Sequence, residues 1–202
     1  GRQVLAMLRQ GGALFRGRHR RKDGSLFPVE VSSRGFVLEG DEVVVSVVRD
    51  VSESEAAVDR IRFLNRILRT ISAVDQILVE EHDRKALLQR ACEEIVASGG
   101  FAFAWFGVEG DHGVVMPAAA AGRVEGYFEE VKAASDASPL GRGPVGTALR
   151  EGRTVVVDDG ETDSLLEPWR EAGRRRGYRS SAACPVRSGE AICGVLSLYA
   201  SQ

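Results

Sequence analysis

One segment of this 202-residue chain has the residue types of an anion site, Gly141-Arg142-Gly143-Pro144. Proline suits the first position of a helix because its missing amide would have no intrahelical partner there, so we expect a helix to begin at Pro144. The free amides and the positive dipole end of such a start can hold an anionic group, assisted by Arg142. The segment lacks the Lys-Ser/Thr of a nucleotide-hydrolase phosphate loop. The alternative is a tight turn that needs the conformational freedom of glycine.

A second candidate combines an aromatic ring with arginine side chains. Trp169 and Arg170 lie at the start of a helix predicted over residues 168–176, and Arg179 lies at the start of the next strand. An indole and a guanidinium suit a planar or carboxylated ligand through stacking and paired hydrogen bonds. The alternative is that Trp169 packs in the core.

The sequence predicts no catalytic centre and no metal site. None of the histidines has a second ligand at metal-binding spacing; they are His19, His82 and His112. The three cysteines form no CxxC pair, and an odd number argues against a disulfide framework; they are Cys92, Cys184 and Cys193. We expect them to be small buried hydrophobic residues. A redox pair of Cys184 and Cys193, in neighbouring strands, is the alternative.

Composition indicates an ordinary globular protein, with 44% hydrophobic and 28% charged residues. A formal charge of −2 gives no field that would attract nucleic acid or an anionic membrane. We therefore interpret the basic clusters at residues 16–22 and 174–176 as solvated faces. No run approaches the roughly 20 apolar residues of a membrane span, and no secretory signal is present. We expect a cytoplasmic location, although a longer parent protein could be membrane-anchored.

The first 80 residues predict a sheet followed by a long helix. After a short helix over residues 3–9, period-two alternation predicts three antiparallel strands within residues 14–49, with a hairpin at Asp23-Gly24. Ser52 and Glu55 match a capping box at a helix start. Residues 53–80 then follow the 4-3 spacing of a coiled coil. The predicted dimer interface is Ala57, Ile61, Leu64, Leu68, Ile71 and Leu78. The alternative is one amphipathic helix lying on its own domain.

The rest of the chain predicts helices alternating with strand pairs. Helices are expected over residues 85–98, 124–134, 144–150 and 168–176, and strands over residues 101–109, 114–121, 154–157, 178–186 and 191–200.

Two stretches resemble known families. Residues 18–31, followed by Arg49-Asp50-Val51-Ser52-Glu53, resemble the C-terminal half of a PAS domain, its last three strands and its exit into a signalling helix. This resemblance implies that the first half of the PAS fold is missing from the chain.

Residues 65–202 resemble a GAF domain of sensor kinases and cyclic-di-GMP enzymes. The resemblance rests on five ordered motifs at residues 87–92, 141–150, 168–170, 177–180 and 194–199. It implies a ligand pocket flanked by the segments named above, with Tyr127, Arg142, Trp169, Arg170 and Arg179 as ligand-binding candidates. The family's final helix is expected to be absent, because the chain stops at Gln202. No haem or bilin attachment residue is evident, and the sequence identifies no particular cofactor.

We therefore predict an α+β chain in three parts: residues 1–52 as half of a PAS domain with antiparallel strands, residues 53–80 as a long linker helix, and residues 81–202 as a GAF domain with an antiparallel sheet and flanking helices. The predicted function is sensory input and dimerisation for a bacterial signal-transduction protein. A small molecule would bind the GAF domain, and a homodimer would pass the signal through the linker helix to an output domain of the parent chain. The alternatives are a ligand-free dimerising module and, as an enzyme, a sulfoxide reductase using Cys184 and Cys193.

Overall fold

The structure is a computed structural model that describes residues 12–201, and the chain divides into two units, Gly1–Asn65 and Arg66–Gln202. The helix predicted over residues 3–9 lies outside the described residues. Between residues 12 and 201, no helix combines the length and the apolar character that a bilayer span requires.

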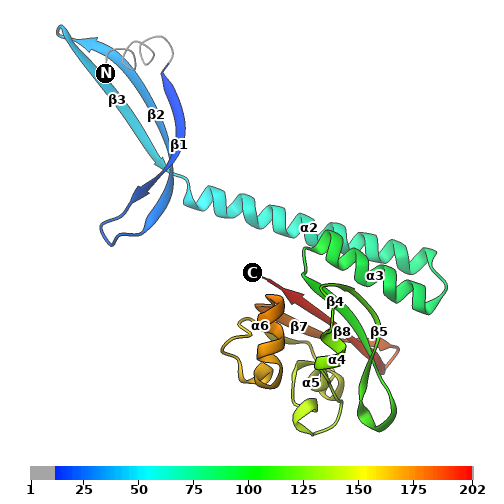
Figure 1. Cartoon of the computed structure of the whole chain (residues 1–202). Coiled ribbons are helices and arrows are strands. Elements are labelled where there is room, and N and C mark those ends of the chain that lie inside the picture. The colour runs from blue at the N-terminus through cyan, green and yellow to red at the C-terminus, as the bar shows by residue number, and fades with distance from the viewer. Residues whose placement is uncertain (1–11, 202) are drawn as a thin grey trace. The chain divides into compact units, whose positions relative to one another are not determined.

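The described part of the first unit contains a three-stranded antiparallel sheet in the order β1-β2-β3 (Figure 1). Its strands are β1 (Ala13–Arg20), β2 (Leu26–Leu38) and β3 (Asp41–Asp50). The predicted hairpin joins β1 to β2, where Gly24 has a φ of 89° and the Asp23 carboxylate accepts hydrogen bonds from the amide and hydroxyl of Ser25. The three strands are those predicted from the alternation, whereas the PAS assignment stays a prediction.

The capping box predicted at Ser52 is wrong, because the preceding aspartate caps this helix. The Asp50 carboxylate accepts the Ser52 amide at 3.0 Å and the Ser52 hydroxyl at 2.6 Å, while the Glu55 amide bonds to the Val51 carbonyl. These bonds from Ser52 lower the pKa of Asp50. Arg21, from the hairpin, also bonds to Asp50 at 2.9 Å. The hairpin and the Asp50-Val51-Ser52 segment, on which the PAS resemblance rests, therefore meet at the start of helix α2.

Helix α2 (Ser52–Glu80) carries two different apolar stripes. The residues of the predicted dimer interface are all exposed: Ala57, Ile61, Leu64, Leu68, Ile71 and Leu78. A second apolar stripe lies on the part of α2 that belongs to the second unit. There Thr70 and Ile77 are buried, and Val74 packs against a core cluster of that unit. Packing of α2 within the second unit therefore buries the second stripe and leaves the side chains of the predicted dimer interface exposed.

The second unit is built on a five-stranded antiparallel sheet in the order β5-β4-β8-β7-β6. Its strands are β4 (Phe103–Glu109), β5 (Val115–Gly122), β6 (Val155–Val157), β7 (Ser180–Ser188) and β8 (Ala191–Ala200). The antiparallel α+β class predicted for this part of the chain is confirmed.

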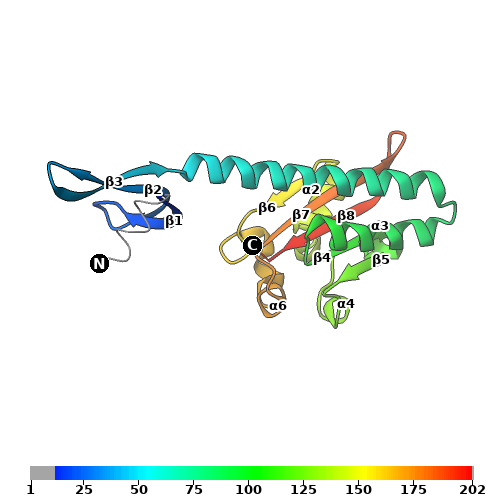
Figure 2. The same ribbon diagram turned by 90° about the horizontal axis from the view of Figure 1, so that it is seen from above.

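Side chains alternate between the two faces of this sheet and form two cores. Phe103 and Trp105 of β4 point to one core, and Ala104 and Phe106 point to the other. Helix α3 (Arg84–Gly99) covers the second face and runs back beside the last turns of α2 (Figures 1 and 2). Helices α4 (Tyr127–Glu130), α5 (Pro144–Glu151) and α6 (Arg170–Arg176) lie on the first face.

Helix ends follow the predicted signals in most places. Helix α3 begins where Asp83 accepts the Ala86 amide and ends at Gly100, with a φ of 78°. Helix α6 ends at Gly177, with a φ of 71°, and is preceded by the 3₁₀ segment η3 (Ser164–Trp169). Two further 3₁₀ turns are η1 (Asp111–Gly113) and η2 (Pro139–Gly141).

The helix predicted over residues 124–134 is wrong beyond a single turn, Tyr127–Glu130. Val131 adopts an extended backbone, the Ala133 carbonyl accepts the Val115 amide, and Ala134 bridges Val114. Residues past 130 therefore extend the edge of the sheet. Apolar periodicity does not reveal this long-range pairing.

Candidate ligand pocket

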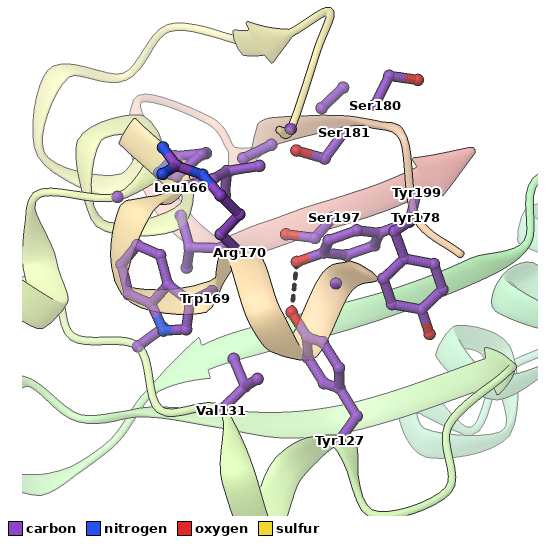
Figure 3. Close-up of a pocket in the computed structure, with 18 of the residues that line it drawn as sticks. Tyr127, Val131, Leu166, Trp169, Arg170, Tyr178, Ser180, Ser181, Ser197 and Tyr199 are labelled. Atoms are coloured by element: carbon purple, nitrogen blue, oxygen red, sulfur yellow. Dashed lines mark hydrogen bonds between the residues drawn. The ribbon is translucent and has the colours of Figure 1, made fainter. Parts of the chain in front are cut away.

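A cavity of about 50 Å³ lies between the first face of the sheet and helices α4, α5 and α6 (Figure 3). Strands β4, β7 and β8 form its floor, and η3 with the start of α6 forms the facing wall. Four of the five predicted ligand-binding residues line it: Tyr127, Trp169, Arg170 and Arg179.

A cluster of tyrosines closes one side of the cavity. The Tyr127 and Tyr199 hydroxyls share a hydrogen bond of 2.7 Å (Figure 3), and Phe103 stacks on Tyr199 with ring centroids 5.3 Å apart. Burial raises the pKa of Tyr127 well above its ordinary value and also raises that of Tyr199. Both hydroxyls are therefore neutral at physiological pH, and each can donate or accept a proton in a hydrogen bond.

Trp169 forms a fixed wall of the cavity. Its indole nitrogen donates to the Lys132 carbonyl at 2.9 Å, and its six-membered ring lies directly against Gly143. A Cβ atom at Gly143 would overlap that ring. Both alternatives for Trp169 therefore hold in part, since the side chain is packed but still lines the cavity.

Arg170 and Arg179 reach the cavity from different elements. One terminal nitrogen of Arg170 donates to the Asp163 carbonyl at 3.1 Å, which anchors the guanidinium beside η3. Arg170 Nε is buried without a partner. Arg179 lines the cavity just before β7, with an exposed side chain.

Arg142, the fifth candidate, does not line the cavity. Its side chain is exposed, and its Nε donates to the Ala137 carbonyl at 3.2 Å. The alternative of a tight turn that needs glycine at positive φ is wrong, because Gly141 and Gly143 have no positive φ. They are needed for close packing, since a Cβ at Gly141 would overlap the Asp136 carbonyl just as one at Gly143 would overlap Trp169.

Arg150 holds the loop before α5 in place, a role that was not predicted from the sequence. Its Nη1 donates to the carbonyl oxygens of Ser135, Asp136 and Gly141, at 3.2 Å and 2.7 Å for the first two. A guanidinium suits this role because it presents several donors in a fixed plane.

Four other polar side chains of the cavity were also missed. Trp105, Ser181, Ser197 and Tyr199 all line it. The strand register pairs Ser181 with Tyr199 and Trp105 with Ser197, so alternation places all four on one face. Serines at inward positions of otherwise apolar strands were the available signal.

The cysteines are free thiols. Cys92 is buried, and burial raises its pKa to about 11. Cys184 pairs with Leu196 across β7 and β8, and Cys193 lies three residues further along its strand, about 10 Å at ~3.4 Å per residue. A disulfide needs Cα atoms within about 7 Å. This arrangement speaks against a redox pair of Cys184 and Cys193.

The basic end of α6 forms ion pairs on the surface. Arg175 and Arg176 pair with Glu130, and Arg174 pairs with Glu171. Arg174 and Arg175 are exposed, as a solvated face requires, whereas the Arg176 side chain is only 15% exposed and its guanidinium lies 5.6 Å from the centroid of the Tyr127 ring. Among residues 12–201, no three His, Cys, Asp or Glu side chains gather as they would around a metal ion.

Comparison with known proteins agrees with this architecture. A family model described as a GAF domain matches residues 81–202. The search of curated proteins found no match. Similar solved structures include the nlh2 GAF domain of A. aeolicus in an inactive state, with a TM-score of 0.56 and 14% identity over 68% of this chain and 80% of that one.

Two further solved structures have the same fold. The GAF domain of a phosphoenolpyruvate-protein phosphotransferase from Coxiella burnetii has a TM-score of 0.57 and 13% identity, over 69% of this chain and 80% of that one. The reduced form of fRMsr from Staphylococcus aureus has a TM-score of 0.50 and 21% identity, over 68% and 79%. At these identities the likeness shows the fold alone.

Proposed function

Since the chain belongs to the GAF domain family through residues 81–202, we propose that it is a sensory input and dimerisation region of a bacterial signal-transduction protein. A small molecule binds in the cavity of the GAF domain, and paired α2 helices pass the signal to an output domain of the parent chain. The first unit acts as the end of a PAS domain that feeds the same helix.

The observation that carries this proposal is the cavity itself. It is lined by aromatic and aliphatic walls together with a few polar groups that converge on it, which is the usual composition of a ligand site. Three of those polar atoms are buried without partners: Arg170 Nε, Ser181 Oγ and Ser197 Oγ. A bound molecule would supply those partners.

Dimerisation through α2 is proposed from its uncovered stripe. Five apolar side chains of the predicted interface are 48–63% exposed, and they recur at coiled-coil spacing. For a ligand to signal through such a pair, it must bind two helix packings with different affinity.

Native mass spectrometry of freshly purified protein tests both parts together, because it reports a retained small molecule and the number of chains. Leu64→Glu and Leu68→Glu should convert the dimer to a monomer in sedimentation velocity, since each places a charge in the apolar stripe. Arg69→Glu, on the same helix but outside the stripe, is the matched control and should stay dimeric. A dimer that survives both leucine changes would remove the coiled coil from the proposal.

The second candidate function is a dimerising and transmitting module without a small-molecule site. The packed position of Trp169, bonded to the Lys132 carbonyl and in contact with Gly143, favours it, because this wall narrows the cavity. A dimer that retains no small molecule and binds none would support this second candidate.

A further inference from the structure

The unpartnered polar atoms of the cavity define what kind of ligand it can take. Ser197 is 1% exposed and Ser181 is 8% exposed, and their hydroxyls point into the cavity from β8 and β7 (Figure 3). Arg170 lies across from them at the start of α6 (Figure 3). A buried polar group without a partner is costly, so a cluster of them in one cavity points to a bound group that satisfies them.

The donors outnumber the acceptors in this cluster. Arg170 Nε can only donate, and the hydroxyls of Ser181 and Ser197 can donate as well as accept. The residues at the start of α5, Gly143, Pro144 and Val145, line the same cavity, and a helix start carries a partial positive charge. The polar end of the ligand must therefore accept several hydrogen bonds at once.

The charges of the lining also favour an anion. Arg170 and Arg179 contribute two cations, whereas Glu161, with an exposed side chain, contributes one carboxylate. Arg170 is anchored by the Asp163 carbonyl, which leaves its Nε for the ligand. A monoanion would balance the excess positive charge.

The size of the cavity limits the ligand to a few atoms. One water needs roughly 10–15 Å³ of such volume, so about 50 Å³ holds about three to five non-hydrogen atoms. Hydrogen bonds hold the surrounding rings, Trp169 to Lys132 and Tyr127 to Tyr199. The remaining walls, Val131, Val145, Leu166 and Ala183, are apolar and suit a short alkyl tail.

We propose that the cavity binds a short-chain carboxylate of about three to five non-hydrogen atoms, whose oxygens accept hydrogen bonds from Ser181, Ser197 and Arg170 Nε. The alkyl end lies against the aliphatic walls. This inference rests on the proposed small-molecule function and names the ligand class for the same site.

Isothermal titration calorimetry of the whole chain tests the ligand class, with four probes at constant ionic strength in chloride. Acetate and propionate match the predicted charge and size, acetamide removes the charge from acetate, and hexanoate exceeds the predicted length. We expect acetamide to bind at least tenfold more weakly than acetate, and hexanoate at least tenfold more weakly than propionate. Equal binding of acetate and acetamide, equal binding of propionate and hexanoate, or no acetate binding at 50 mM would each overturn the inference.

Ser197→Ala tests the contact without relying on activity. It should weaken acetate binding at least fivefold, and it should remove most of the rise in melting temperature that acetate produces. Without acetate the variant should melt at the same or a higher temperature, because an unpartnered buried hydroxyl has been removed. The control is Ser188→Ala, at the exposed end of β7, which should behave as the unmodified chain. Unchanged acetate binding by Ser197→Ala would overturn the assignment.

The two proposals can fail separately. If native mass spectrometry finds a larger or neutral molecule retained by the chain and the carboxylates do not bind, the ligand class is wrong but the sensory function stands. If no molecule is retained and no carboxylate binds, both fail.

Discussion

Replacing Gly143 with alanine should destabilise the second unit strongly, although the change adds one methyl group. The new Cβ would overlap the six-membered ring of Trp169, which is held by its hydrogen bond to the Lys132 carbonyl. Forcing extra volume into a packed site costs ~1–3 kcal/mol. Loss of the indole hydrogen bond adds ~0.5–1.5 kcal/mol. The free energy of unfolding should therefore fall by about 2–4 kcal/mol.

Urea denaturation followed by tryptophan fluorescence measures this change directly. The chain has two tryptophans, Trp105 and Trp169, and both lie in the second unit, so the signal reports on that unit. With an m-value of ~2 kcal/mol/M, in the middle of the usual range for urea, the midpoint should fall by roughly 1–2 M. The control is Gly173→Ala in α6, where the nearest atom to an added Cβ is 4.0 Å away. That change should be neutral or stabilise by up to ~1 kcal/mol, because alanine favours a helix.

A double variant separates the overlap from a general effect of alanine at a helix start. Trp169→Phe removes the outer ring atoms that the new Cβ would meet, so Gly143→Ala should cost less than about 1 kcal/mol in that background. The reasoning is refuted if Gly143→Ala alone shifts the free energy by under ~0.5 kcal/mol, or if the cost is the same with phenylalanine at 169.

Three further changes test other parts of the domain. Arg150→Met removes the donor to three loop carbonyls and should cost ~2–3 kcal/mol in urea denaturation. Tyr127→Phe and Tyr199→Phe should each cost ~1–3 kcal/mol, and the double variant should cost less than their sum, because neither hydroxyl is then left unpaired. Burial raises the pKa of Cys92 from 9.0 to about 11, so the folded chain binds the proton more tightly than the unfolded chain. That contribution to stability is complete below pH 9 and is lost as the pH rises to about 11. Between pH 9 and about 11, the free energy of unfolding should therefore change less with pH in the Cys92→Ala variant than in the unmodified chain.

Local patterns in the sequence were enough to predict most of the elements. Period-two alternation identifies the three strands of the first unit. Short apolar runs between turn signals identify strands of the second unit such as β4, which is buried on both faces. Glycine and proline signals locate the ends of α3, α5 and α6, since their backbone limits act within one or two residues. Five ordered motifs also led to the GAF family, which the family model confirms over residues 81–202.

Tertiary structure alone decided which residues form the pocket and how large it is. Arg142 was predicted from its place before a helix, yet its side chain points away to the Ala137 carbonyl. Ser181 and Ser197 were missed, yet the register of β7 with β8 brings their hydroxyls to one cavity. Long-range pairing determines which faces meet, and the close approach of Trp169 to Gly143 forms one of the walls. Neither the strand pairing nor the contact of Trp169 with Gly143 depends on the spacing of residues along the chain, so neither can be predicted from one sequence.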